Sequence, residues 1–364
     1  MGPISKFQKG PPLARLVLIM ACLNSVLASV SIASSPTIPT LTLNTGKKIP
    51  AIGYGTWQAA EAELEKALDA ALEAGYRHID TAAVYENEKV IGNVIKRWIS
   101  NGKLKREDIF LVTKVPTYAI DPEGVREYLK KSLANLQMDY VDLYLVHTPF
   151  GIKIIEETLH SAVSSGSNVE IDYKTDLLAV WREMEKQVDA GFTKAIGISN
   201  FNKSQVKRIL DNCKIRPSSL QVELHPYLQQ NELVDFCKEN NIVVVAYSPL
   251  GSLGLSVYIE KLGKKEDFQN VLQNPTIKAI AEKHSKTAAQ VVLRFDVQRG
   301  IIPIPKSTNL ERLKQNLDIF DFELDADDIQ KLKKLDAHVR FFNFMIRDGM
   351  ETHPEYPFKD EVHK

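Results

Sequence analysis

The sequence predicts an α/β fold, a (β/α)8 barrel of the TIM type with an N-terminal β-hairpin and long loops at the C-terminal mouth of the barrel. The main observation is an alternation of short β-branched strands with amphipathic helical segments, repeated around eight strands. No linker rich in Gly, Pro or Ser interrupts this alternation, which favours one closed domain. The third observation is size, since 364 residues with 44% hydrophobic side chains suffice for one large core. An open parallel sheet is the alternative.

The pattern begins with a hairpin at residues 40–52, in which two alternating runs flank a turn at 44–47 that contains Gly46, suited to a positive φ. Short β-branched runs then predict eight strands, at 54–56, 78–80, 109–114, 141–147, 195–199, 220–223, 243–248 and 301–305. Helical periodicity predicts helices at 61–74, 87–99, 121–136, 176–190, 203–214, 230–240, 275–284 and 288–298.

Three stretches lack strong periodicity, at 148–175, 251–274 and 337–364. The first two follow the fourth and seventh strands. Because active sites of such barrels lie at the C-terminal ends of the strands, we expect these loops to form walls of a substrate pocket. The third stretch is an aromatic tail that we expect to cover the same mouth, and it contains Phe341, Phe342, Phe344, Tyr356 and Phe358.

The N-terminus differs in composition from the rest of the chain. Basic residues precede an apolar run at 16–23, and small residues follow at Ala28 and Ala33. This order is typical of a secretory signal peptide, whereas a membrane anchor needs about 20 apolar residues and Asn24 interrupts the run. We therefore expect a secreted protein without stable membrane insertion, or a cytoplasmic one if the leader is not functional. The predicted division is a signal peptide at 1–28, a linker at 29–39 and a barrel domain at 40–364.

Overall charge favours small-molecule partners. The chain has 46 Lys+Arg against 46 Asp+Glu and no basic block, so the electrostatic argument for nucleic acid binding is missing. No zinc-like spacing of cysteines and histidines occurs, and we expect no metal. Cys213 and Cys237 are expected as free thiols, although a pairing between them cannot be read from sequence. A glycosylation sequon begins at Asn202.

Chemically active side chains stand where consecutive strands end. Asp80 closes the second strand, Lys114 the third and His147 the fourth, while Tyr85 lies five residues beyond Asp80. Barrel geometry brings these ends to one rim. A phenol with a pKa of ~10 needs a neighbouring cation to become a proton donor near neutral pH, and a shift of about three units takes roughly 4 kcal/mol. We expect Lys114 to lower the pKa of Tyr85, Asp80 to hold Lys114 charged, and His147 to orient a substrate oxygen.

The site has a proton donor but no predicted metal and no nucleophile, which suggests that it reduces a substrate with hydride from a cofactor. The run GYGTW at 53–57 is only half of a G-x-G-x-x-G pattern, so a nicotinamide would need a cradle other than a Rossmann fold. Amide and ring groups suited to its head group follow later strands, at Ser199, Asn200, Gln221, Tyr247 and Ser248. Lys306, Ser307, Arg312 and Asn316 stand at a helix start, where cations and backbone N–H groups suit a phosphate.

Three separated motifs resemble the signatures of the aldo-keto reductase family. They are GYRHIDTAAVYENEKVIG at 75–92, KAIGISNF at 194–201 and IPKSTNLERLKQN at 304–316, with HTP and QVELHP between them. The similarity covers roughly residues 40–360 in order. It implies an eight-stranded barrel that binds NADPH in an extended form and reduces an aldehyde or ketone carbonyl.

The resemblance also implies residue roles. Asp80, Tyr85, Lys114 and His147 match the catalytic tetrad, with Tyr85 as general acid. The cofactor-binding positions it implies are Gly55, Thr56, Trp57, Asp80, Ser199, Asn200, Gln221, Tyr247, Ser248, Leu250, Lys306, Ser307, Arg312, Gln315 and Asn316. Among these, Lys306, Ser307 and Arg312 match the binders of the adenosine 2′-phosphate, which favours NADPH over NADH. The implied substrate-binding positions are Trp57, Tyr85, His147, Thr148 and Pro116.

Departures from the family pattern bear on the substrate. Pro116 and Thr148 stand where aldose-reductase-like members often carry aromatic side chains, which predicts a wider pocket, and Gln315 replaces a glutamate common near the adenine. Secreted insect members that act on steroid ketones share this layout, so a 3-keto ecdysteroid is one candidate substrate and general aldehydes are the other. We expect a monomer. A low-turnover NADPH-binding or redox-sensing barrel is the alternative function, opposed by the complete tetrad.

Overall fold

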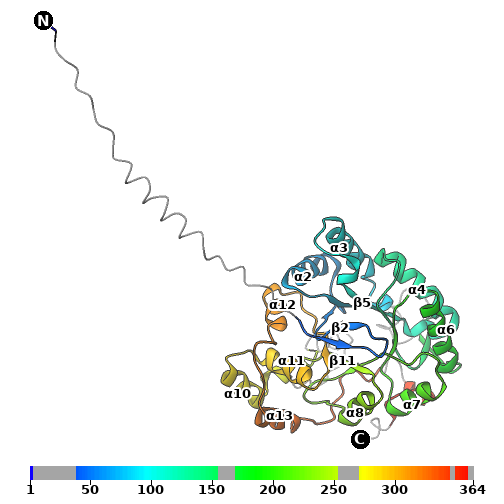
Figure 1. Ribbon diagram of the computed structural model, residues 1–364. Helices are drawn as coiled ribbons and strands as arrows, with labels where there is room; N and C mark the ends of the chain where they lie inside the picture. Colours follow the sequence, from blue (N-terminus) through cyan, green and yellow to red (C-terminus); the bar gives the residue numbers. More distant parts are fainter. Residues whose placement is uncertain (3–37, 155–168, 253–269, 345–348, 360–364) are drawn as a thin grey trace. The chain divides into compact units, whose positions relative to one another are not determined.

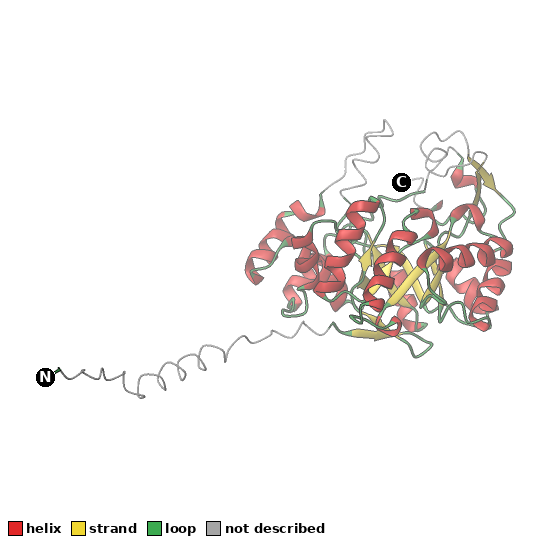
Figure 2. Ribbon diagram, turned by 90° about the horizontal axis from the view of Figure 1, so that it is seen from above, coloured by secondary structure: helices red, strands yellow, loops and turns green. Residues whose placement is uncertain are grey.

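The computed structural model describes residues 1–2, 38–154, 169–252, 270–344 and 349–359. Almost all of the predicted signal peptide and linker lies outside these residues, as do parts of the loops that follow the fourth and seventh barrel strands. The description below concerns the unit Ile38–Lys364. In Figure 1 its helices form a ring around the strands, and Figure 2 shows the strands flanked by helices.

The predicted N-terminal hairpin is present. Strands β1 (Thr40–Thr42) and β2 (Lys48–Pro50) pair antiparallel. Gly46 takes a φ of 81° in the turn, a conformation that glycine adopts without steric cost. Leu43 and Ile49 from this hairpin are buried together with Phe110 and Leu143 from the N-terminal parts of barrel strands. The hairpin therefore packs against the N-terminal end of the barrel and leaves the opposite end for the site.

Eight parallel strands form the barrel, which confirms the predicted fold class. They are β3 (Tyr54–Gly55), β4 (His78–Asp80), β5 (Phe110–Val115), β6 (Leu143–Val146), β9 (Ile196–Ser199), β10 (Ser219–Glu223), β11 (Val243–Tyr247) and β12 (Ile302–Pro303), hydrogen-bonded in this order. The edge strands meet because Gly53 N donates to Pro303 O at 3.0 Å and Gly55 N donates to Pro305 O at 3.3 Å. These two bonds join β3 to the β12 segment around the closing seam.

Helices surround the sheet at the places the periodicity predicts. They are α2 (Glu61–Ala74), α3 (Glu88–Ser100), α4 (Pro122–Leu136), α6 (Leu177–Asp189), α7 (Lys203–Asn212), α8 (Asn231–Glu239), α10 (Pro275–His284) and α11 (Ala288–Gln298). Side-chain caps fix several starts: Asp121, Asp176 and Thr287 each accept a backbone N–H of the first turn. Two shorter helices follow, α12 (Leu310–Leu317) and α13 (Ala326–Lys333). The second of these was not predicted, because eight mostly polar residues give little periodic signal.

The stretch after the fourth barrel strand contains a second hairpin that the sequence did not predict. Strands β7 (Gly151–Ile154) and β8 (Val169–Asp172) pair antiparallel. Ile152 and Val169 from this hairpin are buried with Phe150 and with the C-terminal residues Met350, Tyr356 and Phe358. The aromatic tail therefore packs against the hairpin that follows β6.

Other sequence expectations concern single residues. Cys213 and Cys237 are free thiols, as expected. The amide of Asn202 is engaged on both sides, since its oxygen caps α7 by accepting from Gln205 N at 3.0 Å and its nitrogen donates to Pro357 O at 3.1 Å. Among the described residues, no helix is long and apolar enough to cross a membrane.

Candidate active site

The lysine predicted from the third strand lies inside the barrel. Alternate residues of a strand face the same side, and Phe110 and Val112 of β5 belong to the cluster that fills the barrel interior. Lys114 follows in the same alternation and is 0% exposed. A buried ammonium needs a charged partner and further acceptors, because desolvation otherwise favours its neutral form.

Asp80 and Tyr85 supply those partners. Lys114 Nζ donates to Asp80 Oδ1 at 2.6 Å and to the carbonyl oxygen of Thr81 at 2.9 Å, and it lies 3.4 Å from the Tyr85 hydroxyl oxygen. The same ammonium is 4.9 Å from the centre of the Tyr85 ring. Strand β4 ends at Asp80, and a single 3-10 turn (Ala83–Tyr85) returns the tyrosine to the rim. The structure thus brings together the three groups of the predicted relay.

Asp80 is fixed on both of its oxygens. Gln221 Nε2, from β10 on the other side of the barrel, donates to Asp80 Oδ2 at 2.6 Å, while Oδ1 accepts from Lys114. The hydroxyl of Thr56 donates to the backbone carbonyl of Asp80 at 3.0 Å. Because both oxygens of this buried carboxylate are occupied, it has little freedom to turn away from the ammonium.

Two pKa values in this cluster are raised, for different reasons. Burial opposes the charge of Lys114, but the carboxylate of Asp80 and the nearby phenol outweigh it and raise the pKa of Lys114. Burial also raises the pKa of Tyr85, and the neighbouring ammonium of Lys114 only partly counteracts this. Lys114 acts on the pKa of Tyr85 in the predicted direction, but the expected fall of this pKa below its ordinary value is wrong for this structure, because the phenol is desolvated along with its partner. The phenol is fully protonated at neutral pH and is ready to donate.

His147 lies beside the phenol at the end of β6. Its ring centre is 5.8 Å from that of Tyr85, in an edge-to-face arrangement. Burial, followed by the charge of Lys114, holds the pKa of His147 well below its ordinary value, so the imidazole is neutral. Its Nδ1 atom is buried and has no hydrogen-bond partner among the described residues. Asn200 Nδ2 donates to the backbone carbonyl of His147 at 2.8 Å, which ties β6 to β9 at the rim.

A set of amide and hydroxyl groups continues this rim. Asn200 Oδ1 accepts from the Tyr247 hydroxyl at 2.8 Å, and Ser199 Oγ donates to Gln221 O at 2.8 Å. Asn200 takes a left-handed φ of 63°, which Asn tolerates better than most residues. The half-buried side chain of Tyr247 is held at its hydroxyl end. A flat head group with a carboxamide fits this combination of amides and ring.

The other predicted cofactor residues lie along β3, β11 and the segment after β12. Lys306 and Arg312 are exposed, and Arg312 lies in the first turn of α12, where the side chain of Asn309 caps the helix. Ser307 and Asn316 are buried nearby. Two cations beside a helix N-terminus fit a phosphate group. Gly55 has a packing explanation of its own, since a Cβ there would lie 2.6 Å from Ile304 O.

Aromatic rings border the mouth. Phe342 of the tail lies edge-on to Trp57, with ring centres 5.4 Å apart, and to Tyr247, at 5.5 Å. The expectation that the tail reaches the mouth is thus met at Phe342. Thr148 and Pro116 are buried, and the Thr148 hydroxyl donates to Phe150 O at 2.8 Å, while the wider pocket expected at these positions stays a prediction. Contact of either residue with a substrate stays a prediction.

One residue at the mouth escaped the sequence analysis. Glu223 ends β10 as Asp80 ends β4, and it is 0% exposed. The signal that pointed to Asp80, an acidic residue at the C-terminal end of a barrel strand, was equally present here.

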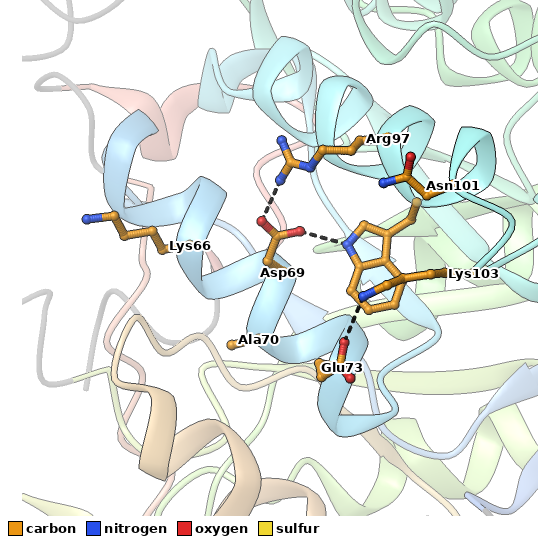
Figure 3. Close-up of a pocket in the computed structure, with 8 residues that line it drawn as sticks. Lys66, Asp69, Ala70, Glu73, Arg97, Asn101 and Lys103 are labelled. Atoms are coloured by element: carbon orange, nitrogen blue, oxygen red, sulfur yellow. Dashed lines mark hydrogen bonds and ion pairs between the residues drawn. The ribbon is translucent and has the colours of Figure 1, made fainter.

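A cavity of about 450 Å³ lies elsewhere, on the outer side of the ring between α2 and α3 (Figure 3). Most of its polar groups pair with one another, since Asp69 accepts from Arg97 and from Trp98 Nε1, and Glu73 pairs with Lys103. It contains none of the predicted site residues, and none of its lining atoms is a buried polar atom without a partner. The rim of the barrel is therefore the candidate active site.

Comparisons with known proteins agree with this geometry. A family model described as "Aldo/keto reductase family" matches residues 51–337. The chain belongs to the aldo/keto reductase family. Dihydrodiol dehydrogenase 3 of Bos taurus is 43% identical over 324 residues, which are 88% of this chain and 97% of that protein. Prostaglandin F synthase 1 of Bos taurus is 42% identical with the same coverage.

Solved structures of this family share the fold. The aldose reductase from Schistosoma japonicum superposes with a TM-score of 0.78 and 37% identity, covering 89% of this chain and all of that one. The crystal structure of an aldo-keto reductase complexed with NADPH has a TM-score of 0.77 and 38% identity, covering 88% and 94%. The family resemblance drawn from the sequence motifs is confirmed, and this aldo/keto reductase is an oxidoreductase of a family that uses NADP(H).

Proposed function

We propose that the protein is an NADPH-dependent carbonyl reductase in which Tyr85 is the general acid. The observation that carries the proposal is the buried arrangement in which the ammonium of Lys114 contacts both the carboxylate of Asp80 and the hydroxyl of Tyr85. When bound, NADPH supplies the hydride that adds to the carbonyl carbon. The phenol proton of Tyr85 then passes to the carbonyl oxygen, which gives the alcohol.

The chain's own groups lower the barrier for this proton transfer. A protonated phenol donates only if the phenolate it leaves is stabilised, and the adjacent ammonium of Lys114 provides that stabilisation inside a low-dielectric site. Asp80 keeps the ammonium charged and aimed at the phenol. The neutral imidazole of His147, edge-on to the phenol, donates a hydrogen bond to the same carbonyl oxygen and orients it.

Cofactor placement follows from the two fitting regions described above. Ser199, Asn200 and Gln221 would hold the carboxamide of the nicotinamide, and the Tyr247 ring would stack against the nicotinamide ring. Lys306, Ser307 and Arg312 would bind the 2′-phosphate. Gly55, Thr56, Trp57, Ser248, Leu250, Gln315 and Asn316 complete the proposed set. The relative complexed with NADPH supports this choice of cofactor.

The proposed substrates are aldehydes and ketones with apolar bodies. The rings of Trp57 and Phe342 at the mouth favour apolar over charged substrates. Relatives named for dihydrodiol and prostaglandin F suggest ring-bearing compounds, so a test panel should pair simple aldehydes with cyclic and steroid ketones, the 3-keto ecdysteroids included.

Tyr85→Phe tests the general acid. This variant keeps the ring and loses the proton, so we expect carbonyl-dependent oxidation of NADPH to fall by at least about 100-fold. The NADPH dissociation constant, measured by fluorescence titration, should stay within about twofold of the wild type. Tyr140→Phe is the matched control, because Tyr140 precedes β6 at the opposite end of the barrel. Turnover retained in Tyr85→Phe would contradict the assignment.

A low-turnover NADPH-binding or redox-sensing protein is the second candidate function. It predicts tight NADPH binding by the wild type with no loss of NADPH absorbance for any carbonyl in the panel. The buried, satisfied Asp80–Lys114 pair beside the phenol favours the enzyme, since binding alone does not need a desolvated ammonium.

We also propose that the protein enters the secretory pathway. The order of basic, apolar and small residues within 1–28 supports this, and sequencing the N-terminus of the native protein tests it. A mature N-terminus downstream of Ala28 is expected, whereas detection of residues 1–28 in the native protein would contradict export.

A further inference from the structure

The C-terminal tail is tied to the barrel by one buried carboxylate. Glu223 Oε1 accepts from the backbone N–H of Phe341 at 2.7 Å, and Oε2 accepts from the backbone N–H of Phe342 at 2.9 Å. Two consecutive N–H groups that converge on one anion make a strong and directional contact. His225 Nε2 lies 3.0 Å from Oε1, and an Arg340 nitrogen lies 4.0 Å from Oε2. Both oxygens of a side chain that is 0% exposed are thus used to hold the tail.

Neighbouring contacts extend this anchor along the loop that follows β10. The backbone N–H groups of Ala337 and Val339 both donate to Tyr227 O, at 3.1 and 3.0 Å. The ring of Phe341 stacks on the ring of His225, with centres 4.6 Å apart and planes at 18°. The tail therefore runs back across the loop at the end of the sixth barrel strand, and it reaches the mouth at Phe342.

Phe342 is the residue that this anchor places over the site. Its backbone N–H is held by Glu223, while its ring lies edge-on to Trp57 and to Tyr247 at once. In the proposed function these two residues border the substrate and the nicotinamide. In that function the Phe342 ring, in contact with both of them, would border the body of a carbonyl compound bound beside Tyr85.

We infer that Glu223 is a positioning residue for substrate selection: it fixes the Phe342 ring as an apolar wall of the pocket, and the enzyme thereby favours bulky apolar carbonyl compounds over small ones. Glu223 itself touches neither substrate nor reacting atoms. This inference rests on the proposed carbonyl reductase function.

Glu223→Gln tests the anchor with little change in shape. An amide has one acceptor oxygen, so its NH2 group must face the N–H of Phe341 or Phe342, and one of the two contacts is lost. With 2-naphthaldehyde as a bulky apolar substrate, we expect KM to rise about tenfold and kcat to change less than threefold, the size expected for losing one aromatic contact. With propanal, kcat/KM should stay within threefold of the wild type, as should NADPH affinity.

Glu185→Gln is the matched control. Glu185 on α6 is also buried, and its Oε1 accepts two consecutive backbone N–H groups, from Lys214 at 2.6 Å and Ile215 at 2.9 Å. These residues precede β10, at the end of the strand opposite to Glu223. Both variants should lose thermal stability, but only Glu223→Gln should change KM for 2-naphthaldehyde. Glu223→Asp replaces Glu223→Gln in this test if the amide variant fails to fold. It keeps the negative charge on a shorter side chain, and it should also raise KM for 2-naphthaldehyde.

A double variant distinguishes positioning from general weakening. If Glu223 acts through Phe342, then Glu223→Gln combined with Phe342→Ala gives the same KM for 2-naphthaldehyde as Phe342→Ala alone. Additive increases in KM, or equal behaviour of Glu223→Gln and Glu185→Gln, would overturn the inference. A wild type that oxidises NADPH with neither aldehyde would instead refute the proposed function.

Discussion

The ion pair between Asp80 and Lys114 allows a quantitative test of the site. Its nitrogen and oxygen are 2.6 Å apart, and the two side chains are 3% and 0% exposed. At an effective dielectric constant of about 20, two unit charges at this distance attract by about 6 kcal/mol, which desolvation of both groups largely offsets. Removing one partner of such a pair leaves an unpaired buried charge and typically costs about 3–5 kcal/mol.

We expect Asp80→Asn and Lys114→Met each to lower the free energy of unfolding by about 3–5 kcal/mol. The double variant should be less destabilised than the sum of the two, by about 3 kcal/mol, because it buries no unpaired charge. Denaturant unfolding of the four proteins at pH 7, without cofactor, measures these values. The raised pKa of Lys114 means that its contribution is fully present below about pH 10.4 and is lost only above that, so pH 7 samples the charged pair.

Activity supplies the second readout for the same variants. All three should lose turnover, because Lys114→Met removes the charge that stabilises the phenolate of Tyr85, and Asp80→Asn removes the carboxylate that holds the ammonium in place. Additive destabilisation, within about 0.5 kcal/mol, would show that the pair is not coupled, and near-normal turnover in Lys114→Met would refute the role of the ammonium in proton transfer.

Three further predictions concern single positions. Burial raises the pKa of Asp296 to about 8, so between about pH 4 and 8 the folded state holds a proton that the unfolded state has lost. The free energy of unfolding should therefore fall by about 1.4 kcal/mol per pH unit over this range. Urea titrations at several pH values should show this slope for the wild type and not for Asp296→Asn. Gly55→Ala should destabilise the cofactor-free protein by about 1–3 kcal/mol, since its Cβ would meet Ile304 O, and an unchanged melting temperature would contradict this. Because His147 is neutral, kcat/KM should be flat from about pH 6 to 8, and a step near pH 6.5 that disappears in His147→Gln would oppose that assignment.

Most of the barrel follows from local sequence patterns. Helices α2, α10 and α11 and strand β4 have the predicted bounds, and the other barrel elements differ by a few residues at their ends. These elements have clear periodicity or lie between turn residues, so the signal is local. The hairpin β7–β8 was missed because its two short strands, Gly151–Ile154 and Val169–Asp172, are far apart in sequence, and the burial that stabilises it comes from Phe150 and the distant tail.

Which residues meet at the candidate site could be predicted from the sequence, but the pKa of Tyr85 could not. Spacing places Asp80, Lys114 and His147 at strand ends, and the structure brings them together. The direction of the pKa of Tyr85 depends on how much of the phenol is removed from water, which no spacing reveals, and here burial outweighs the cation. The place of Glu223 at a strand end was visible in the sequence, but its role was not, since its partners are backbone N–H groups of a tail that lies more than 100 residues away.

Asp80 and Glu223, the two carboxylates at strand ends, have different proposed roles in the site. Asp80 faces the barrel interior and holds an ammonium, and in the proposed function it thereby supports proton transfer to the carbonyl oxygen. Glu223 ends a strand on the other side of the barrel and holds two backbone N–H groups, and in the inference drawn above it fixes the surface that the rest of the substrate meets. Gln221, two residues before Glu223 on β10, donates to Asp80 at 2.6 Å and links the two functions through one strand. A displacement of β10 at the rim would therefore disturb both the orientation of Asp80 and the position of the Phe342 wall.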